Sequence, residues 1–230
     1  MKKIGIIGGL GPEATVDYYR IIIESYREKT KGSFPAIIIY SLDIKELSCM
    51  VKTDERDRIA AWLADAVRSL HRAGADFALI ASNTPHVVFD KVKELSPIPL
   101  LSIVEETCKA AVHMGLKKLG LMGTKVTMSN TFYQEVFSKK DISIVVPGEQ
   151  EQDYIHKKLV NEIMFNKIVE ETRNELLKII KRMVENASIQ GLILGCTELP
   201  LILTKDEFGI PFLNTTKIHA ESAVKYCLEE

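Results

Sequence analysis

The sequence predicts an α/β protein with two pseudo-symmetric lobes, each a parallel sheet flanked by helices. Two observations lead to this prediction. Short apolar segments alternate with longer amphipathic segments along the whole chain of 230 residues, and such alternation is typical of parallel sheets covered by helices on both faces. The same pattern begins again near residue 117 with a similar sequence, so one α/β unit is expected to occur twice.

In the first half of the chain, expected strands and helices follow one another in turn. Proline in the first turn suits the helix that begins at Pro12, and the helix over residues 56–72 has one apolar face and ends before Gly74. The expected strands cover residues 4–7, 36–40, 77–81 and 100–104. The expected helices cover residues 12–27, 56–72, 86–95 and 105–113.

In the second half the alternation resumes. The continuous apolar run over residues 191–194 is typical of a strand buried within a parallel sheet. The expected strands cover residues 117–122, 142–146, 191–194 and 211–213. The expected helices cover residues 128–137, 152–165, 168–186 and 218–228.

Direct sequence matches support the repeat. KKIGIIG at residues 2–8 matches KKLGLMG at residues 117–123, and IPLLSIVEETCKAA from Ile98 matches IPFLNTTKIHAESA from Ile210. We expect an N-terminal lobe of residues 1–99 plus 206–230 and a C-terminal lobe of residues 100–205. Two such lobes should face each other across a cleft.

Composition predicts a cytoplasmic protein that acts on a small molecule. The net charge is −1 without a basic block, which gives no reason to expect nucleic acid or an anionic membrane as a partner. No apolar stretch approaches the ~20 residues of a membrane span, and the first one is too short for a signal-peptide core. The four cysteines are widely spaced, so we expect free thiols and no metal site.

Polar side chains follow two of the expected strands at corresponding points of the repeat. They are Cys196, Thr197 and Glu198 in GLILGCTELP, and Ser82, Asn83 and Thr84 in ALIASNTP. Ligands of open α/β sheets bind at the carboxyl ends of strands. A thiol there can act as base or nucleophile, and we expect backbone N–H groups at a helix start to lower its pKa. The sequence therefore predicts an active site built on an unequal pair, a thiol and a hydroxyl.

The glycines after the first strand have two interpretations. Gly8, Gly9 and Gly11 resemble a dinucleotide loop, but the spacing is not G-x-G-x-x-G and Pro12 stands where an N–H would be wanted. Tight turns that let the backbone approach a small ligand are the favoured interpretation. Their N–H groups would suit a carboxylate as well as a phosphate.

Histidines and cations near the motifs also have a structural alternative. His86 is expected to be a helix-start or core residue, rather than a base beside the thiol. Lys52, Arg56 and Arg58 follow the second strand. They are either a solvated helix start or a clamp for an acidic substrate.

SNTPH at residues 82–86 and GCTELP at residues 195–200 resemble the paired CNTxH and GCTE motifs of the aspartate/glutamate racemase family, and the opening IGIIGGLGPEAT resembles its aspartate racemase branch. The resemblance covers essentially the whole chain. It implies two pseudo-symmetric α/β lobes, homodimers, and racemisation without any cofactor by two cysteines on opposite faces of the substrate Cα.

The chain departs from this family pattern at informative positions. Ser82 stands where the first catalytic cysteine is expected, a substitution that some similar members carry while keeping activity on one enantiomer. Gly8 and Gly9 stand where the glutamate racemase branch carries an acidic residue. The arginine that aspartate racemases place after the second strand has Ser48 and Lys52 among its nearest equivalents.

The predicted function is cofactor-independent racemisation of an acidic amino acid, aspartate or also glutamate, with a bias to one enantiomer. Cys196 removes the Cα proton and Ser82 returns one to the other face. The expected substrate-binding residues are Asn83, Thr84, Thr197, Gly9, Lys52 and Thr124. Two alternatives stay open: a decarboxylase or isomerase of the same superfamily that uses Cys196 alone, and a non-catalytic carboxylate-binding homologue.

Overall fold

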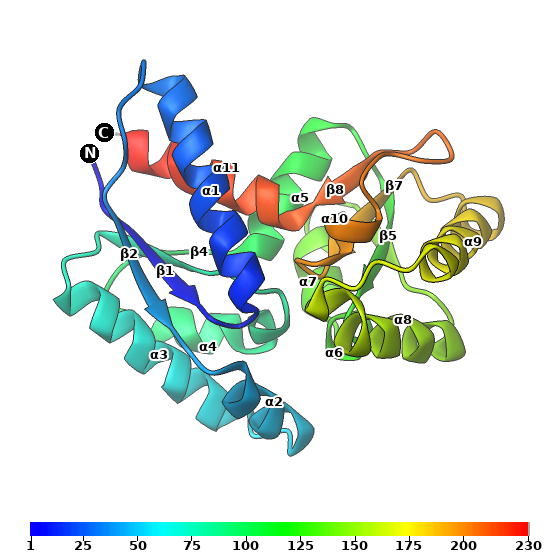
Figure 1. Ribbon diagram of the computed structural model, residues 1–230, viewed down its shortest axis with the longest axis horizontal. Coiled ribbons are helices and arrows are strands. Elements are labelled where there is room, and N and C mark those ends of the chain that lie inside the picture. The colour runs from blue at the N-terminus through cyan, green and yellow to red at the C-terminus, as the bar shows by residue number, and fades with distance from the viewer. Residues whose placement is uncertain (230) are drawn as a thin grey trace. The chain divides into compact units, whose positions relative to one another are not determined.

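The computed structural model describes residues 1–229 and divides into two compact units. The first unit contains Met1–Glu106 and the chain from Thr216 onward, and the second contains Thr107–Thr215. Each unit holds one four-stranded parallel sheet with helices on its faces (Figure 1). The predicted fold class, two α/β units with parallel sheets, is confirmed.

The first sheet has the strand order β2-β1-β3-β4. Its strands are β1 (Ile4–Gly8), β2 (Ile37–Ser41), β3 (Phe77–Ile80) and β4 (Leu100–Leu101). Ile4 of the central strand β1 pairs with Ile37 on one side and with Phe77 on the other. All carboxyl ends therefore lie at one edge of the sheet.

Side chains alternate between the two faces of the first sheet and so select the helices that cover them. Ile4 and Ile6 pack with helices α1 (Pro12–Lys29) and α11 (Thr215–Leu228). Ile7 faces the opposite way, into a cluster with helices α2 (Ile44–Lys52), α3 (Arg56–Arg72) and α4 (Phe89–Glu94) (Figure 1). The loop from β3 to α4 contains the short 3-10 helix η1 (Thr84–Val88).

The second sheet has the same organisation, with the order β6-β5-β7-β8. Its strands are β5 (Lys118–Gly123), β6 (Ser143–Val145), β7 (Gly191–Gly195) and β8 (Phe212–Asn214). Leu192 and Leu194 pack with α8 (Glu149–Asn161), α9 (Glu170–Ala187) and the short α10 (Leu199–Ile202). The remaining elements of this unit are α6 (Lys125–Ser129), α7 (Phe132–Ser138) and the 3-10 helix η2 (Ile163–Phe165).

Each repeat ends in a helix that lies in the unit built mainly by the other repeat. The last helix of the first repeat lies mostly in the second unit, and the last helix of the second repeat lies in the first unit. The chain leaves the first unit within α5 (Ile103–His113), after β4 has paired with β3, and returns at the start of α11, after β8 has paired with β7. Two tyrosines at corresponding positions of the repeat hydrogen-bond these exchanged helices. Buried Tyr18 of α1 hydrogen-bonds His219 of α11, and buried Tyr133 of α7 hydrogen-bonds Thr107 of α5. The passages expected near residues 100 and 205 thus fall a short way further along the chain.

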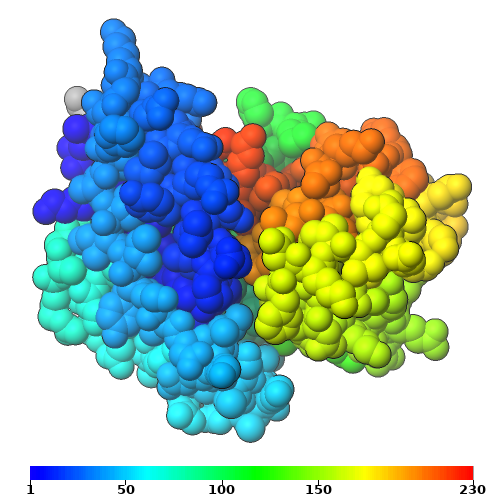
Figure 2. Space-filling view, in the orientation of Figure 1, coloured from blue at the N-terminus to red at the C-terminus, as the bar shows by residue number. Residues whose placement is uncertain are grey.

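Local signals explain where the observed elements differ from the expected ones. The expected strand over residues 100–104 is short because the Ser102 hydroxyl accepts from the Glu105 N–H and starts α5. The expected helix over residues 128–137 is two helices, because Asn130 is extended between α6 and α7. Helix α2 was not predicted; it begins where the Asp43 carboxylate accepts from the Lys45 N–H. Helix α2 lies at the surface of the first unit, in light blue in Figure 2.

Candidate active site

The carboxyl ends of β5 and β7 are packed against each other without side chains. Gly123 and Gly195 are partners in the parallel ladder. A Cβ atom on Gly123 would lie 2.6 Å from the Gly195 carbonyl oxygen, closer than real contacts allow. Glycine is therefore required at position 123, beside the residue that precedes Cys196, and the same edge carries Thr124 one residue further on.

Cys196 faces a buried carboxylate. Its side chain is 5% exposed, and its Sγ donates a hydrogen bond to Glu198 Oε2 at 2.9 Å. The Thr197 hydroxyl donates to the same oxygen at 2.8 Å, and Glu198 is itself buried. One oxygen of the Glu198 carboxylate thus accepts hydrogen bonds from both neighbouring side chains.

This surrounding raises the pKa of the Cys196 thiol well above its ordinary value. Burial is the largest cause, followed by the negative charge of Glu198 and its hydrogen bond, whereas backbone N–H groups of Glu198 and Thr197 act in the opposite direction. The predicted lowering of this pKa is wrong, because burial and the adjacent carboxylate outweigh the helix start. The resting state of the site is therefore a protonated thiol.

Glu198 is the site residue to which the sequence pattern assigned no role. Its position two residues after the thiol in GCTELP was visible, but a carboxylate so close to a solvent-exposed strand end is ordinarily a solvated side chain. Burial changes its role, because a buried carboxylate that already accepts the thiol hydrogen bond can also accept the proton. Cys196 and Glu198 together form a buried, hydrogen-bonded pair of thiol and carboxylate.

Thr124 and Thr197 each have a defined local partner. Thr124 is the N-cap of α6; its hydroxyl lies 3.3 Å from the Thr127 N–H and 3.1 Å from the Thr127 hydroxyl. The hydroxyl hydrogen of Thr197 is directed at Glu198. Thr197 therefore offers a lone pair, which suits an ammonium group of a ligand better than a carboxylate.

In the first unit, Ser82, Asn83 and Thr84 lie in the loop after β3. The Ser82 N–H donates to the Ile80 carbonyl at 2.8 Å, which bends the chain directly after the strand. Ser82 is 7% exposed, Asn83 is buried and Thr84 is partly buried. Because β1 pairs with β3, Gly9 follows its strand at the same sheet edge. The structure thus brings these four predicted residues to one edge.

Gly9 is explained by packing inside the protein. Its φ is +80°, and a Cβ atom would lie 2.1 Å from the Leu42 carbonyl oxygen. Its N–H donates to the Thr15 hydroxyl at 2.8 Å. The glycine therefore allows the turn after β1 to pass close to the end of β2, and its N–H already has a partner within the fold.

Two buried histidines support the Ser82 loop. His86 Nδ1 lies 3.0 Å from the Ser82 carbonyl oxygen, and His219 Nε2 lies 3.1 Å from the Leu101 carbonyl oxygen. The pKa of each ring is lowered to about 3, by burial in both rings and also by the neighbouring His219 in the case of His86. Both rings are therefore neutral, and the interpretation of His86 as a core residue agrees with this environment.

Lys52 is set apart from the other predicted site residues of the first unit. It is the exposed last residue of α2, a nine-residue helix that begins at the carboxyl end of β2, so it lies ~12 Å along the helix from that edge. The cations that follow it pair locally: Arg56 with Asp54 and Arg58 with Glu55, each at 2.9 Å.

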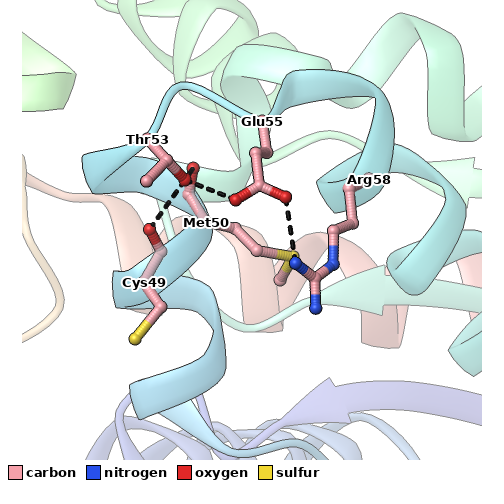
Figure 3. Close-up of polar contacts among 5 residues, drawn as sticks. All are labelled: Cys49, Met50, Thr53, Glu55 and Arg58. Carbon is pink, nitrogen blue, oxygen red and sulfur yellow. Dashed lines mark hydrogen bonds and ion pairs between the residues drawn. The ribbon is translucent and has the colours of Figure 1, made fainter.

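Figure 3 shows that Glu55 also accepts from the Thr53 hydroxyl at 2.5 Å, next to Cys49 and Met50 at the end of α2. The hydrogen bonds from Thr53 and Arg58 lower the pKa of Glu55. The hydrogen bond to Glu55 in turn raises the pKa of Arg58. The segment is an exposed, internally paired start of α3, in agreement with its structural interpretation. The alternative, a substrate clamp, stays a prediction.

Within residues 1–229, no group of three or more histidine, cysteine or acidic side chains is arranged to hold a metal ion. Across the same residues, every helix is too short or too polar to cross a membrane. All four cysteines are free thiols, as expected.

The profile of the Asp/Glu/hydantoin racemase family matches residues 7–223. The chain belongs to this family. A relative named broad-specificity amino-acid racemase, from Bacillus subtilis, is 26% identical over 226 residues, which are 96% of each chain. Homologues of this chain are named racemases, which are isomerases.

Solved structures of Asp/Glu racemase relatives have the same fold. An aspartate racemase homologue from Pyrococcus horikoshii is 34% identical, with complete coverage of both chains and a TM-score of 0.85. The aspartate racemase of Picrophilus torridus is 22% identical, with coverage of 98% of this chain and 94% of the other and a TM-score of 0.76. The family that the strand-end motifs predicted is thus confirmed by matches over nearly the whole chain.

Proposed function

We propose that this protein is a cofactor-independent racemase of an acidic amino acid, aspartate or glutamate, in which Cys196 and Ser82 act on opposite faces of the substrate Cα. The observation that carries the proposal is the hydrogen bond from the buried Cys196 thiol to buried Glu198 at the end of β7. Ser82 occupies the equivalent place after β3. Membership of the racemase family and the aspartate racemase homologue support the choice of substrate.

Proton removal begins with Glu198. The thiol proton moves from Cys196 Sγ to the carboxylate, which leaves a thiolate and a neutral Glu198. The thiolate then takes the Cα proton of the substrate. Burial, the largest cause that raises the pKa of this thiol, persists when Glu198 is neutral, so the thiolate is a stronger base than an ordinary cysteine. This suits the weakly acidic Cα–H.

Proton return depends on Ser82. Its hydroxyl hydrogen goes to the opposite face of the carbanion, which inverts the centre and leaves a Ser82 alkoxide. Water then returns a proton to the alkoxide, and Glu198 releases its proton to water, so both groups regain their starting states. A serine hydroxyl is a poor base, so exchange without inversion is expected to be slow for the enantiomer whose Cα–H faces Ser82. By analogy with the family, that is the D-enantiomer. Backbone N–H groups near the strand ends stabilise the enolate-like charge that develops.

The two enantiomers have equal free energy, so racemisation requires equal kcat/KM in both directions. The predicted bias therefore appears elsewhere. Cys196 can remove a Cα proton from the L-enantiomer and return a solvent-derived one to the same face, which labels the substrate without inverting it. We expect this exchange from the L-form to be faster than inversion, and exchange from the D-form to be slower.

The test is ¹H NMR of each enantiomer of aspartate and glutamate in D₂O, with protein dialysed against chelator and no added cofactor. Loss of the Cα signal from the L-form with slower appearance of the D-form is the expected result. Release of CO₂ instead would establish the single-cysteine decarboxylase. No exchange from any acidic substrate would leave the carboxylate-binding homologue, and activity only after metal is restored would contradict cofactor independence.

Glu198→Gln should separate catalysis from thiol reactivity. The substitution keeps the size of the side chain but cannot accept the proton, so Cα exchange should fall by roughly 10²–10⁴-fold. Loss of the negative charge also removes two causes that raise the thiol pKa, so the alkylation of Cys196 by iodoacetamide should reach half-maximum at lower pH.

Alkylation is measured in a Cys49→Ser background, because Cys49 is exposed. Glu46→Gln, on the exposed surface of α2, is the matched control. An unchanged exchange rate, or an alkylation midpoint that moves to higher pH, would show that Glu198 is not the proton acceptor.

A further inference from the structure

His86 joins the Ser82 loop to the start of α5. Its Nδ1 lies 3.0 Å from the Ser82 carbonyl oxygen, and its Nε2 lies 3.2 Å from the Ile103 backbone nitrogen. A backbone N–H can only donate, so Nε2 carries the lone pair and Nδ1 the hydrogen. The hydrogen of His86 is therefore directed at the Ser82 carbonyl, with the Asn83 backbone as a second hydrogen-bond partner, and the ring cannot serve Ser82 as a base.

Neighbouring rings hold His86 in one orientation. Phe89 stacks on it with ring centroids 4.9 Å apart and an interplanar angle of 6°, and His219 meets it edge-on at 6.3 Å. His219 is fixed in turn, because it donates through Nε2 to the Leu101 carbonyl and accepts from the Tyr18 hydroxyl at 2.9 Å. The network ties the Ser82 loop, the end of β4, α1 and α11 together within the first unit.

We propose that His86 is a positioning residue for Ser82. The proposal rests on the proposed function, in which Ser82 returns the proton. Ser82 stands in a bend after β3, where its carbonyl takes no part in the strand ladder. The His86 bond fixes the orientation of that peptide group, and hence the direction in which the Ser82 side chain leaves the backbone. The bond to Ile103 anchors the same ring where the chain starts α5.

Two substitutions separate the hydrogen bond that the ring donates to Ser82 from the one that it accepts from Ile103. The amide of asparagine reaches the place of Nδ1, so His86→Asn can still donate to the Ser82 carbonyl. The amide of glutamine reaches the place of Nε2, so His86→Gln can still accept from the Ile103 N–H but releases Ser82. Misplacement of a reacting group by about 1 Å can cost 10²-fold. We expect His86→Gln to slow inversion of the L-substrate 10- to 100-fold, and His86→Asn to slow it less than about 3-fold.

Exchange without inversion is the internal control, because it depends on Cys196 and should stay within about 3-fold of wild type in both variants. His113→Gln, on the exposed end of α5, controls for the substitution itself. Equal loss of exchange and inversion in both His86 variants would indicate a merely structural role and overturn the proposal.

Ser82→Ala distinguishes failure of this proposal from failure of the proposed function. If Ser82→Ala leaves inversion intact, Ser82 is not the second acid and the proposed mechanism fails. If it stops inversion while His86→Gln does not slow it, the positioning role alone fails. To examine any residual inversion, the two substitutions are combined; His86→Gln should then have no further effect on a Ser82→Ala background.

A measurement on the wild-type protein needs no variant. ¹⁵N–¹H correlation spectra of the histidine rings report which nitrogen carries hydrogen. The expected result is the Nδ1–H form for His86 and the Nε2–H form for His219, as their backbone partners require. An Nε2–H form for His86 would mean that Ser82 is not held, and would overturn the proposal.

Discussion

Cys196→Ala is expected to abolish Cα exchange and inversion, with a loss of at least about 10³-fold. Alanine cannot take a proton, and the proposed mechanism has no other base on the face that Cys196 serves. The fold should survive, because the change removes one sulfur atom at the edge of a core cluster and costs about 1 kcal/mol. Deuterium exchange from L-aspartate by NMR measures the loss, and the thermal midpoint checks folding.

Cys227→Ala is the matched control, since Cys227 is also buried but lies in α11, where it packs with the first sheet. It should keep the full exchange rate. Wild-type exchange in folded Cys196→Ala protein would rule out the assignment of the thiol. Exchange that persists in Cys196→Ser at a reduced rate would agree with it, because a hydroxyl keeps a hydrogen bond to Glu198 and is a weaker acid.

The fold was predictable because its signals are local. The buried runs that become β1 and β7, and the apolar face of α3 ended by Gly74, are visible in consecutive residues. The duplicated KKxGxxG segment then predicts the second sheet from the first. Helix α2 was missed because its buried face is small, with Leu47 and Met50 as its buried residues.

The exchange of the last helices depends on contacts distant in sequence. The hydrogen bond from Tyr18 to His219 joins residues near opposite ends of the chain. Repeat matching aligns Thr107 with His219, yet only the folded structure shows that each contacts the equivalent tyrosine of the other repeat. Local patterns determine the elements, whereas the packing of elements determines the unit to which each helix belongs.

The positions of the predicted site residues at strand ends were predictable, but their environment was only partly so. Cys196 and Ser82 follow strands, and parallel strands bring such residues to sheet edges. The pKa of Cys196 was predicted in the wrong direction because burial, the largest cause, is a property of the folded core. Likewise, Gly9 has a conformational signal in the sequence, but the Leu42 carbonyl that requires it belongs to another strand end.

Acid is expected to destabilise the protein through the two buried histidines. The pKa of both His86 and His219 is about 3 in the folded protein, against an ordinary value of 6.5. As the pH falls below 6.5, the unfolded chain binds protons at these rings and the folded chain does not. The stabilisation is therefore complete above pH 6.5 and is lost progressively as the pH falls to about 3.

Each histidine should lower the free energy of unfolding by about 1.4 kcal/mol per pH unit within this window. Glu55 and Glu162, whose pKa values are lowered from 4.5, contribute only below that value. The interval from pH 6.5 to about 5 thus isolates the histidines from these two carboxylates. The rings contact each other and several uncharged groups: the Ser82, Asn83 and Leu101 backbones, the Ile103 N–H, the Tyr18 hydroxyl and Phe89.

Urea unfolding at a series of pH values measures the slope for wild type and for the double variant His86→Asn/His219→Gln, whose amides do not titrate. The double variant should be less stable at pH 7 but lose stability much less steeply between pH 6.5 and 5, so the two curves converge in acid. His156, whose pKa is also lowered, is the same in both proteins and cancels in the difference. His113→Asn, at an exposed position, should follow wild type. Rings that are neutral in the folded protein and protonated in the unfolded chain must make the free energy of unfolding of wild type depend more steeply on pH than that of the double variant. Parallel curves for the two proteins would therefore show that the buried histidines do not cause the loss of stability in acid.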